Sequence, residues 1–221
     1  MKRPYVHVNC ASTVDGKIAL VDGRRLRISD RWDMERVHLL RRRLGSVLVG
    51  AGTVISDDPK LSARSTSSVG RIPVTKIVVD GRGRISPGSR FLKTEGRSLV
   101  VTSDWSENDW RDSIRREGGE IVMIDPESEN GNISIPRLLN VLKSMDVHGI
   151  LVEGGSRIIW EFVSSGLFDR FTVYFGPLFL GGSGPTISSG PGFDKKPMEL
   201  KLTSQVRSPE GGILLEYSPI S

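Results

Sequence analysis

Residues 149–160, GILVEGGSRIIW, combine an apolar run with an acid, two glycines and a serine. The run at 150–152 is typical of a buried strand, and Gly154 and Gly155 after it let the backbone turn sharply and approach a ligand. Ser156 can then cap a helix, whose free amides favour an anion such as a dinucleotide pyrophosphate. The GxGxxG spacing of the common nucleotide fingerprint is missing, so an ordinary strand-to-helix turn is the alternative interpretation.

The segment ASTVDGK, residues 11–17, follows the first apolar run and contains the residues of a tight turn. Asp15 and Gly16 are frequent in such turns, and Lys17 places a cation beside them. The segment on its own favours a structural turn in which Asp15 hydrogen-bonds its own backbone.

A second set of glycines repeats the strand-to-helix pattern. Gly50 and Gly52 come at the end of the apolar run SVLVG and lead into a short predicted helix. Thr53 supplies a hydroxyl near the start of that helix, where free backbone amides again suit an anion.

Two adjacent acids, Asp57 and Asp58, stand directly before Pro59, which ends the short helix and keeps the next residues extended. Two neighbouring carboxylates would repel each other if both were buried. One interpretation is a solvated cap in which one acid hydrogen-bonds the loop. The other is that one carboxylate orients a ligand hydroxyl or amide, with Arg64 available to bind a phosphate.

The segment VVDGRGR, residues 78–84, places an acid and two arginines after a buried strand. In dinucleotide-binding folds an acid at such a position binds the ribose hydroxyls of NAD, whereas arginine favours the 2′-phosphate of NADP. Asp80, Gly81 and Arg82 are therefore candidate cofactor ligands, and Arg82 with Arg84 favours NADPH. A loop with solvated arginines is the alternative.

These segments must be positioned by a framework of alternating strands and helices. Apolar runs predict strands at 5–9, 46–49, 74–79, 98–102, 120–124, 150–152, 170–174 and 214–217, and helical patterns lie at 30–45, 106–116, 136–145 and 156–165. This order predicts a single α/β domain over residues 1–221, with a mostly parallel sheet, helices on both faces and an antiparallel C-terminal end. Ligands bind such sheets at the carboxyl ends of the strands, where the VEGGS turn is expected.

Composition limits the class of function. The 221 residues include one cysteine, Cys10, and three histidines without metal-ligand spacing, so we expect neither an internal disulfide nor a metal site. No apolar run approaches membrane length, and we expect a cytoplasmic protein without a membrane partner. The net charge of +5 favours anionic partners, which small phosphorylated ligands satisfy as well as nucleic acid does.

Taken together, the segments ASTVDGK, VGAGTVISDDPKLSAR, VVDGRGRISP and LVEGGSRIIWEFVSSGLFDRF, in this order, resemble the reductases of riboflavin biosynthesis. The resemblance runs from Pro4 to Glu216, and the joint occurrence of TV..DDP..L and LVEGG makes it specific. It is shared with stand-alone archaeal and fungal reductases and with the reductase domain of the bacterial deaminase-reductase. It implies a dihydrofolate-reductase-like α/β fold, NADPH as the hydride donor and a homodimer.

The resemblance also implies roles for individual residues. Positions that hold the cofactor in the family fall on Ala11, Thr53, Asp57, Gly81, Gly154, Gly155 and Ser156, and those that hold substrate fall on Arg41, Leu61, Arg64 and Glu153. Asp57, Glu153 and Lys17 are the candidates for proton transfer. Bacterial members carry a serine and a tryptophan where this chain has Arg25 and Arg27, so contacts there are left open.

The zinc-binding HxE and PCxxC pair of the bacterial deaminase half does not occur in the sequence, and we expect a reductase without a deaminase. Stand-alone family members reduce before deamination, which implies 2,5-diamino-6-ribosylamino-4(3H)-pyrimidinone 5′-phosphate as the small phosphorylated substrate. The alternatives are reduction of the deaminated pyrimidine, a dihydrofolate or pteridine reductase of the same fold, and a basic nucleic-acid-binding domain. We expect no nucleic-acid partner.

Overall fold

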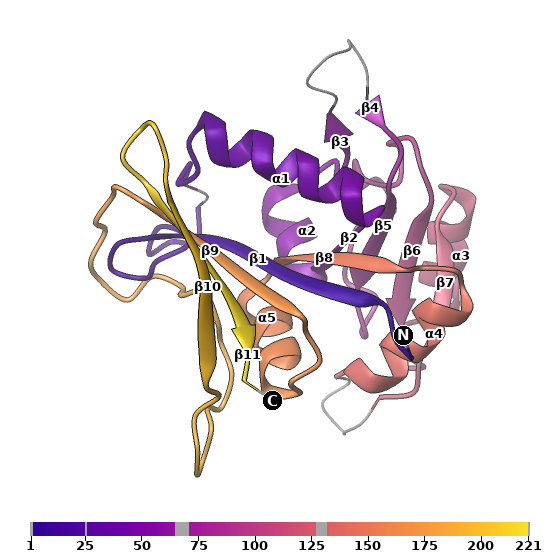
Figure 1. The fold of residues 1–221 in the computed structure, drawn as a ribbon. Helices are drawn as coiled ribbons and strands as arrows, with labels where there is room; N and C mark the ends of the chain where they lie inside the picture. Colours follow the sequence, from indigo (N-terminus) through magenta and orange to yellow (C-terminus); the bar gives the residue numbers. More distant parts are fainter. Residues whose placement is uncertain (1, 25, 65–70, 127–131, 221) are drawn as a thin grey trace.

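One twisted sheet runs through the molecule, as the computed structural model in Figure 1 shows for residues 2–24, 26–64, 71–126 and 132–220. From edge to edge its nine strands are β10 (Leu200–Arg207), β11 (Ile213–Pro219), β9 (Arg170–Gly176), β1 (Tyr5–Thr13), β8 (Gly149–Gly154), β2 (Ser46–Gly50), β5 (Thr75–Val79), β6 (Ser98–Thr102) and β7 (Glu120–Met123). The strands from β9 to β7 are parallel, and β11 runs antiparallel to both β9 and β10. The predicted parallel sheet with an antiparallel C-terminal end is confirmed.

Helices cover both faces of the sheet in the described part of the chain (Figure 1). They are α1 (Arg31–Leu44), α2 (Ala51–Asp57), α3 (Asn108–Arg116), α4 (Ile135–Ser144) and α5 (Ser156–Ser164), and a two-stranded ladder joins β3 (Ala63–Arg64) to β4 (Arg71–Ile72). Within the described residues, no helix combines the length and apolarity needed to cross a membrane. The predicted helices agree with the observed ones to within two residues at each end.

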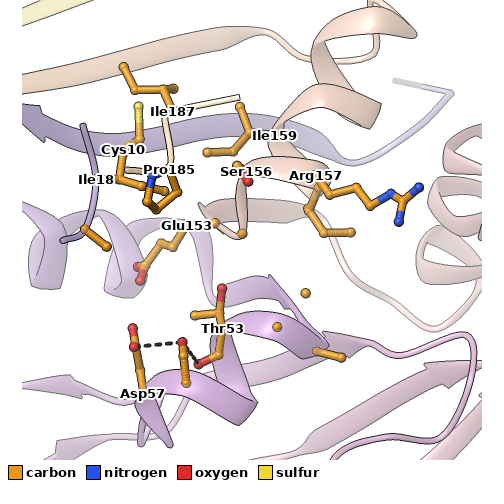
Figure 2. A pocket seen from close by; sticks show the side chains of 18 of the residues that line it. Cys10, Ile18, Thr53, Asp57, Glu153, Ser156, Arg157, Ile159, Pro185 and Ile187 are labelled. Atoms are coloured by element: carbon orange, nitrogen blue, oxygen red, sulfur yellow. Dashed lines mark hydrogen bonds between the residues drawn. The ribbon is translucent and has the colours of Figure 1, made fainter. Parts of the chain in front are cut away.

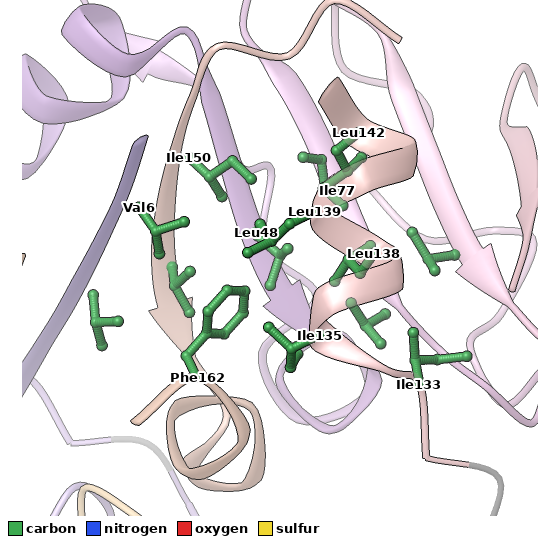
Figure 3. Close-up of a cluster of buried hydrophobic side chains, with 14 of the residues drawn as sticks. Val6, Leu48, Ile77, Ile133, Ile135, Leu138, Leu139, Leu142, Ile150 and Phe162 are labelled. Carbon is green, nitrogen blue, oxygen red and sulfur yellow. The ribbon is translucent and has the colours of Figure 1, made fainter. Parts of the chain in front are cut away.

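The larger apolar core lies between the sheet and helices α4 and α5 (Figure 3). Successive strand residues point to opposite faces, so Leu48 and Ile77 pack beneath α4 while Val47 and Val78 enter a second core with α2 and α3. Leu138 of α4 is fully buried. Burying one such side chain stabilises the fold by about 1.5–3 kcal/mol, so the two cores hold the strand ends rigidly in place.

Helix α1 begins and ends where its capping residues predict. The Asp33 amide donates to Asp30 Oδ1 at 2.8 Å, and the helix ends at Gly45, which has a left-handed φ of 74°. The helix packs over β8 and β2 on the face opposite α4, and Arg36 reaches Asn9 of β1 at 2.7 Å.

Two strands of the nine-stranded sheet differ most from the sequence prediction, which also did not include the short strands β3 and β4. β1 continues to Thr13, because its last residues pair with β9, so Ala11 lies within the strand and not in the turn. β10 was not predicted, because its sequence LKLTSQVR carries polar side chains on both faces and lies at the exposed edge of the sheet. A register shift between Leu202 and Ser204 weakens the alternation further.

We predict that His7 makes stability depend on pH. The His7 ring is 5% exposed, contacts the Thr172 hydroxyl, and has a pKa lowered from 6.5 to about 4 by burial and by Arg36, Arg170 and Arg43. In the unfolded chain His7 is therefore protonated below about pH 6.5, whereas in the folded protein it is protonated only below about pH 4. We expect the unfolding free energy to fall by about 3 kcal/mol across this interval. Denaturant unfolding at several pH values measures this dependence. Between pH 6.5 and 4 the unfolding free energy of His7→Gln should change less with pH than that of the wild type. An equal pH dependence of the two proteins would contradict the assignment.

Candidate active site

A cavity of about 610 Å³ opens at the carboxyl ends of β1, β8, β2 and β5, the edge that the sequence predicted (Figure 2). Its walls come from α2, the start of α5, the loop after β5, residues 18–19, 23 and 26–29, and residues 185 and 187. This size suits a small organic ligand or cofactor.

The turn between β8 and α5 depends on its glycines. Gly154 has a φ of 139° and Gly155 a φ of 50°, both of which L side chains rarely adopt. α5 begins at Ser156 with Gly155 as its N-cap, and no side chain caps it. The prediction that Ser156 caps the helix is therefore wrong, since Ser156 is the first helical residue. Because no side chain caps α5, the backbone amides at its start remain free at the cavity wall.

The starts of α2 and α5 lie against each other. A Cβ on Gly50 would come within 2.8 Å of the Ile158 side chain, and one on Gly155 would lie 3.4 Å from Thr53 Oγ1. Thr53 lies in the first turn of α2 and lines the cavity, facing Ser156 across it in Figure 2. The glycines thus allow two helix starts to form one wall.

The adjacent acids at the end of α2 have different environments. Asp57 lines the cavity, and Ser56 Oγ donates to its Oδ1 at 2.8 Å (Figure 2). Asp58 adopts a left-handed φ of 38°, and its Oδ1 accepts from the Arg90 amide at 2.8 Å. Asp58 therefore holds the loop, and Asp57 is the carboxylate that can meet a ligand.

Glu153, at the end of β8, is held by Arg41 of α1. Arg41 donates from Nε to Oε1 at 2.6 Å and from Nη2 to Oε2 at 2.5 Å, and its Nη1 bonds the Ser62 carbonyl at 2.7 Å. Burial alone would lower the Arg41 pKa, but the Glu153 carboxylate raises it above its usual value. Glu153 lines the cavity, whereas Arg41 lies behind it. The pair thus presents a charged, oriented acceptor to the cavity, as Figure 2 shows for Glu153.

Asp15 joins two loops that wall the cavity. Its carboxylate accepts from the Leu180 amide at 3.1 Å, the Gly181 amide at 2.7 Å and the Thr13 hydroxyl at 2.6 Å. The Thr13 hydrogen bond and these amides lower the Asp15 pKa to about 2. The predicted turn is present, but Asp15 bonds a loop about 165 residues away in addition to its own turn.

The structure brings most of the predicted site residues to one cavity. Those that line it are Ala11, Thr53, Asp57, Gly81, Arg82, Glu153, Gly154, Gly155 and Ser156. Arg27 lines it too and is exposed, while Arg25 lies outside the described residues. Lys17, Arg41 and Arg64 are not in the lining, and their contacts with a ligand stay predictions. Sequence reasoning missed Met34, Pro185 and Ile187, whose apolar types carry no signal for a cavity.

Two residues predicted to bind a ligand have buried side chains outside the cavity lining. Asp80 is buried, and its Oδ2 accepts from the Arg84 and Ile85 amides at 2.6 and 2.8 Å, so its carboxylate shapes the loop and does not face the cavity. The Leu61 side chain is 2% exposed and packs into the second apolar core. Neither side chain lines the cavity.

Comparison with known proteins matches the RibD C-terminal domain family over residues 4–214. An Archaeoglobus fulgidus protein named 2,5-diamino-6-ribosylamino-4(3H)-pyrimidinone 5′-phosphate reductase is 34% identical, covering 88% of this chain and 90% of that protein. The structure of Acinetobacter baumannii RibD superposes with a TM-score of 0.81 at 24% identity, over 100% of this chain and 59% of that one. Enterococcus faecalis dihydrofolate reductase superposes with a TM-score of 0.52 at 13% identity over 98% of this chain and 97% of that one, so the predicted dihydrofolate-reductase-like fold is confirmed.

Proposed function

The chain belongs to the RibD C-terminal domain family, and on that basis we propose that it is a single-domain, NADPH-dependent reductase of riboflavin biosynthesis. Its proposed substrate is the compound in its archaeal relative's name, 2,5-diamino-6-ribosylamino-4(3H)-pyrimidinone 5′-phosphate. The product carries a ribityl chain in place of the ribose.

One observation carries the proposal. Glu153, held by Arg41, stands directly before the Gly154–Gly155 turn, so an oriented carboxylate and the open start of a helix share one cavity wall. The helix start and glycines suit a pyrophosphate. The carboxylate accepts hydrogen bonds only, which suits the amino groups of a diaminopyrimidine. A cofactor and a substrate can therefore meet in this cavity.

The glycine turn provides a fit test for the cofactor. Side chains on Gly154 and Gly155 would be strained by the left-handed backbone angles there, whereas glycine adopts these angles and leaves the backbone of this wall open to a pyrophosphate. Arg82 and Arg84 line the same cavity near β5, where they can meet a 2′-phosphate. NADPH, when bound, supplies the hydride.

The reaction needs a hydride at C1′ of the ribosylamine and a proton at the departing ring oxygen or the imine nitrogen formed by ring opening. Glu153 orients the pyrimidine, and Asp57 faces the cavity from α2. Lys17 lies outside the lining, so Asp57 and Glu153 are the candidates for the proton step. Arg27 is exposed and lines the cavity, so it is available to the 5′-phosphate, whereas a contact of Arg64 with this phosphate stays a prediction because Arg64 lies outside the lining.

An absorbance assay tests the function. Purified protein with NADPH and the diamino substrate should lose nicotinamide absorbance, and NADH should react more slowly. The deaminated pyrimidine and dihydrofolate, run in parallel, should be poorer substrates. No turnover of the diamino compound would overturn the proposal, and faster turnover of the deaminated one would reverse the order of reduction and deamination. A homodimer and a cytoplasmic location remain predictions, the first of which light scattering can check.

We predict that Asp57→Asn lowers turnover by at least about tenfold, equivalent to about 1.4 kcal/mol of barrier, without unfolding the protein. The change removes a charge at the cavity but keeps the shape of a half-buried side chain. The matched control is Asp58→Asn, because Asp58 bonds the Arg90 amide and not the cavity. Asparagine keeps an oxygen that accepts from the Arg90 amide, so Asp58→Asn should change thermal stability little and leave turnover near wild type. Near-normal turnover by Asp57→Asn would remove Asp57 from the catalytic role.

A further inference from the structure

The loop that follows β5, residues 80–85, is fixed to its neighbours by side chains from β6, from the residue after β6, and from α3. The Thr102 hydroxyl donates to the Asp80 carbonyl at 2.8 Å, and the Ser103 hydroxyl donates to the Gly81 carbonyl at 2.7 Å. The Trp110 indole N–H bonds the Ile85 carbonyl at 2.8 Å. We call residues 80–85 the β5 loop.

Close packing holds the middle of the β5 loop as well. Gly83 has a φ of 67°, and a Cβ there would lie 3.0 Å from the Trp110 ring and from Ser106. The loop therefore has little freedom to rearrange around a ligand. Specificity at this end of the cavity must come from side chains that the loop projects.

Arg82 is such a side chain, and an aromatic ring supports it. Its guanidinium carbon lies 5.5 Å from the centroid of the Trp105 ring, a cation–π distance. Trp105 is 49% exposed, and its amide is bonded to Ser103 Oγ at 3.2 Å. Arg82 lines the cavity, whereas Trp105 does not. The Trp105 ring thus contacts Arg82 without being part of the cavity lining.

The position of Arg82 matches the adenosine end of a dinucleotide. In the sheet order β8-β2-β5, the β5 loop lies two strands from the glycine turn, a distance of about 10 Å at the usual strand spacing. A cofactor whose pyrophosphate lies at the start of α5 can extend its adenosine ribose over this distance. The 2′-phosphate, the group that separates NADPH from NADH, would then face Arg82.

We propose that Trp105 is a positioning residue for cofactor specificity, which stacks on Arg82 and holds its guanidinium ready for the 2′-phosphate of NADPH. An unsupported arginine loses rotamer freedom when it binds an anion, which costs binding free energy. An arginine already held by an aromatic ring avoids most of this cost. This inference rests on the proposed function, because it deepens the assignment of NADPH as cofactor.

Calorimetric titration of the full chain tests the inference without substrate. The probes are NADPH, NADH, adenosine 2′,5′-bisphosphate and 5′-AMP. The variants are Trp105→Leu, Trp105→Phe, Arg82→Gln and the double variant Trp105→Leu/Arg82→Gln. Arg115→Gln is the matched control, because Arg115 is an exposed arginine on α3 paired with Asp112. Thermal unfolding of each variant accompanies the titrations. We expect the Trp105 variants to stay folded, because the Trp105 ring is half-exposed.

We expect Trp105→Leu to lower the affinity for NADPH and for the bisphosphate about fivefold. The affinities for NADH and 5′-AMP, and kcat at saturating NADPH, should not change. Trp105→Phe should retain most of the affinity, and the double variant should bind no more weakly than Arg82→Gln alone. Equal weakening of NADPH and NADH, additive losses in the double variant, or unchanged NADPH affinity in Trp105→Leu would each overturn the inference. If the wild type binds neither NADPH nor the bisphosphate, the proposed function fails and this inference fails with it.

Discussion

Replacing Glu153 with glutamine is expected to lower kcat/KM by about a hundredfold or more, while NADPH affinity changes little. The Glu153 carboxylate is 12% exposed and held by two hydrogen bonds from Arg41. Glutamine keeps the shape but removes the charge, so the side chain accepts less strongly from substrate and leaves Arg41 unneutralised. Losing one partner of a buried charge pair costs about 2–5 kcal/mol, which covers the expected loss. Steady-state kinetics with the diamino substrate measures it.

A second variant separates contact from positioning. Arg41→Lys keeps the positive charge but cannot reproduce two parallel hydrogen bonds, so it should loosen the Glu153 carboxylate and lower kcat/KM less, by about tenfold. Thermal unfolding should show both variants folded but less stable than wild type, because each disturbs a largely buried ion pair. Wild-type kcat/KM in folded Glu153→Gln would remove Glu153 from the substrate site.

Local signals in the sequence predict much of the fold. Asp30 and Gly45 predict both ends of α1, because a side-chain acceptor and a left-handed glycine satisfy the free backbone groups at helix ends. The turn at Gly154 is predictable for the same reason, since few residues besides glycine tolerate its backbone angles. The apolar runs predict the parallel strands, whose carboxyl ends must share one edge of the sheet.

Contacts between distant residues have no such signal. Arg41 and Glu153 are separated by 112 residues, and no local spacing relates them. An acid after a strand can face a ligand or turn inward, and only the packing of the β5 loop decides that Asp80 turns inward. The cavity wall that Asp15 organises likewise depends on how two remote loops meet. The sequence therefore predicts the place of the site better than the partners of its side chains.

Replacing Lys76 with methionine is expected to lower the unfolding free energy by about 3 kcal/mol at pH 7. Lys76 lies on β5 with its side chain fully buried, and Nζ donates to the carbonyls of Phe91 at 2.9 Å, Glu95 at 3.3 Å and Thr94. Burial lowers its pKa to about 8, which still leaves the ammonium protonated at pH 7 with three N–H donors for three acceptors. Methionine fills a similar volume but leaves buried carbonyls without this donor, a loss of about 1–3 kcal/mol for each group left unsatisfied.

The loop that Lys76 holds is also joined to the end of α2, which borders the cavity, because the Arg90 amide next to this loop donates to Asp58 Oδ1. We therefore expect folded Lys76→Met to lose activity at a lower temperature than wild type, with the same kcat well below its melting point. Denaturant unfolding measures the loss, and Lys93→Met is the matched control, since Lys93 is exposed on the same loop and its change should stay within about 0.5 kcal/mol. If both variants unfold at the wild-type denaturant concentration, Lys76 does not hold the loop to the sheet.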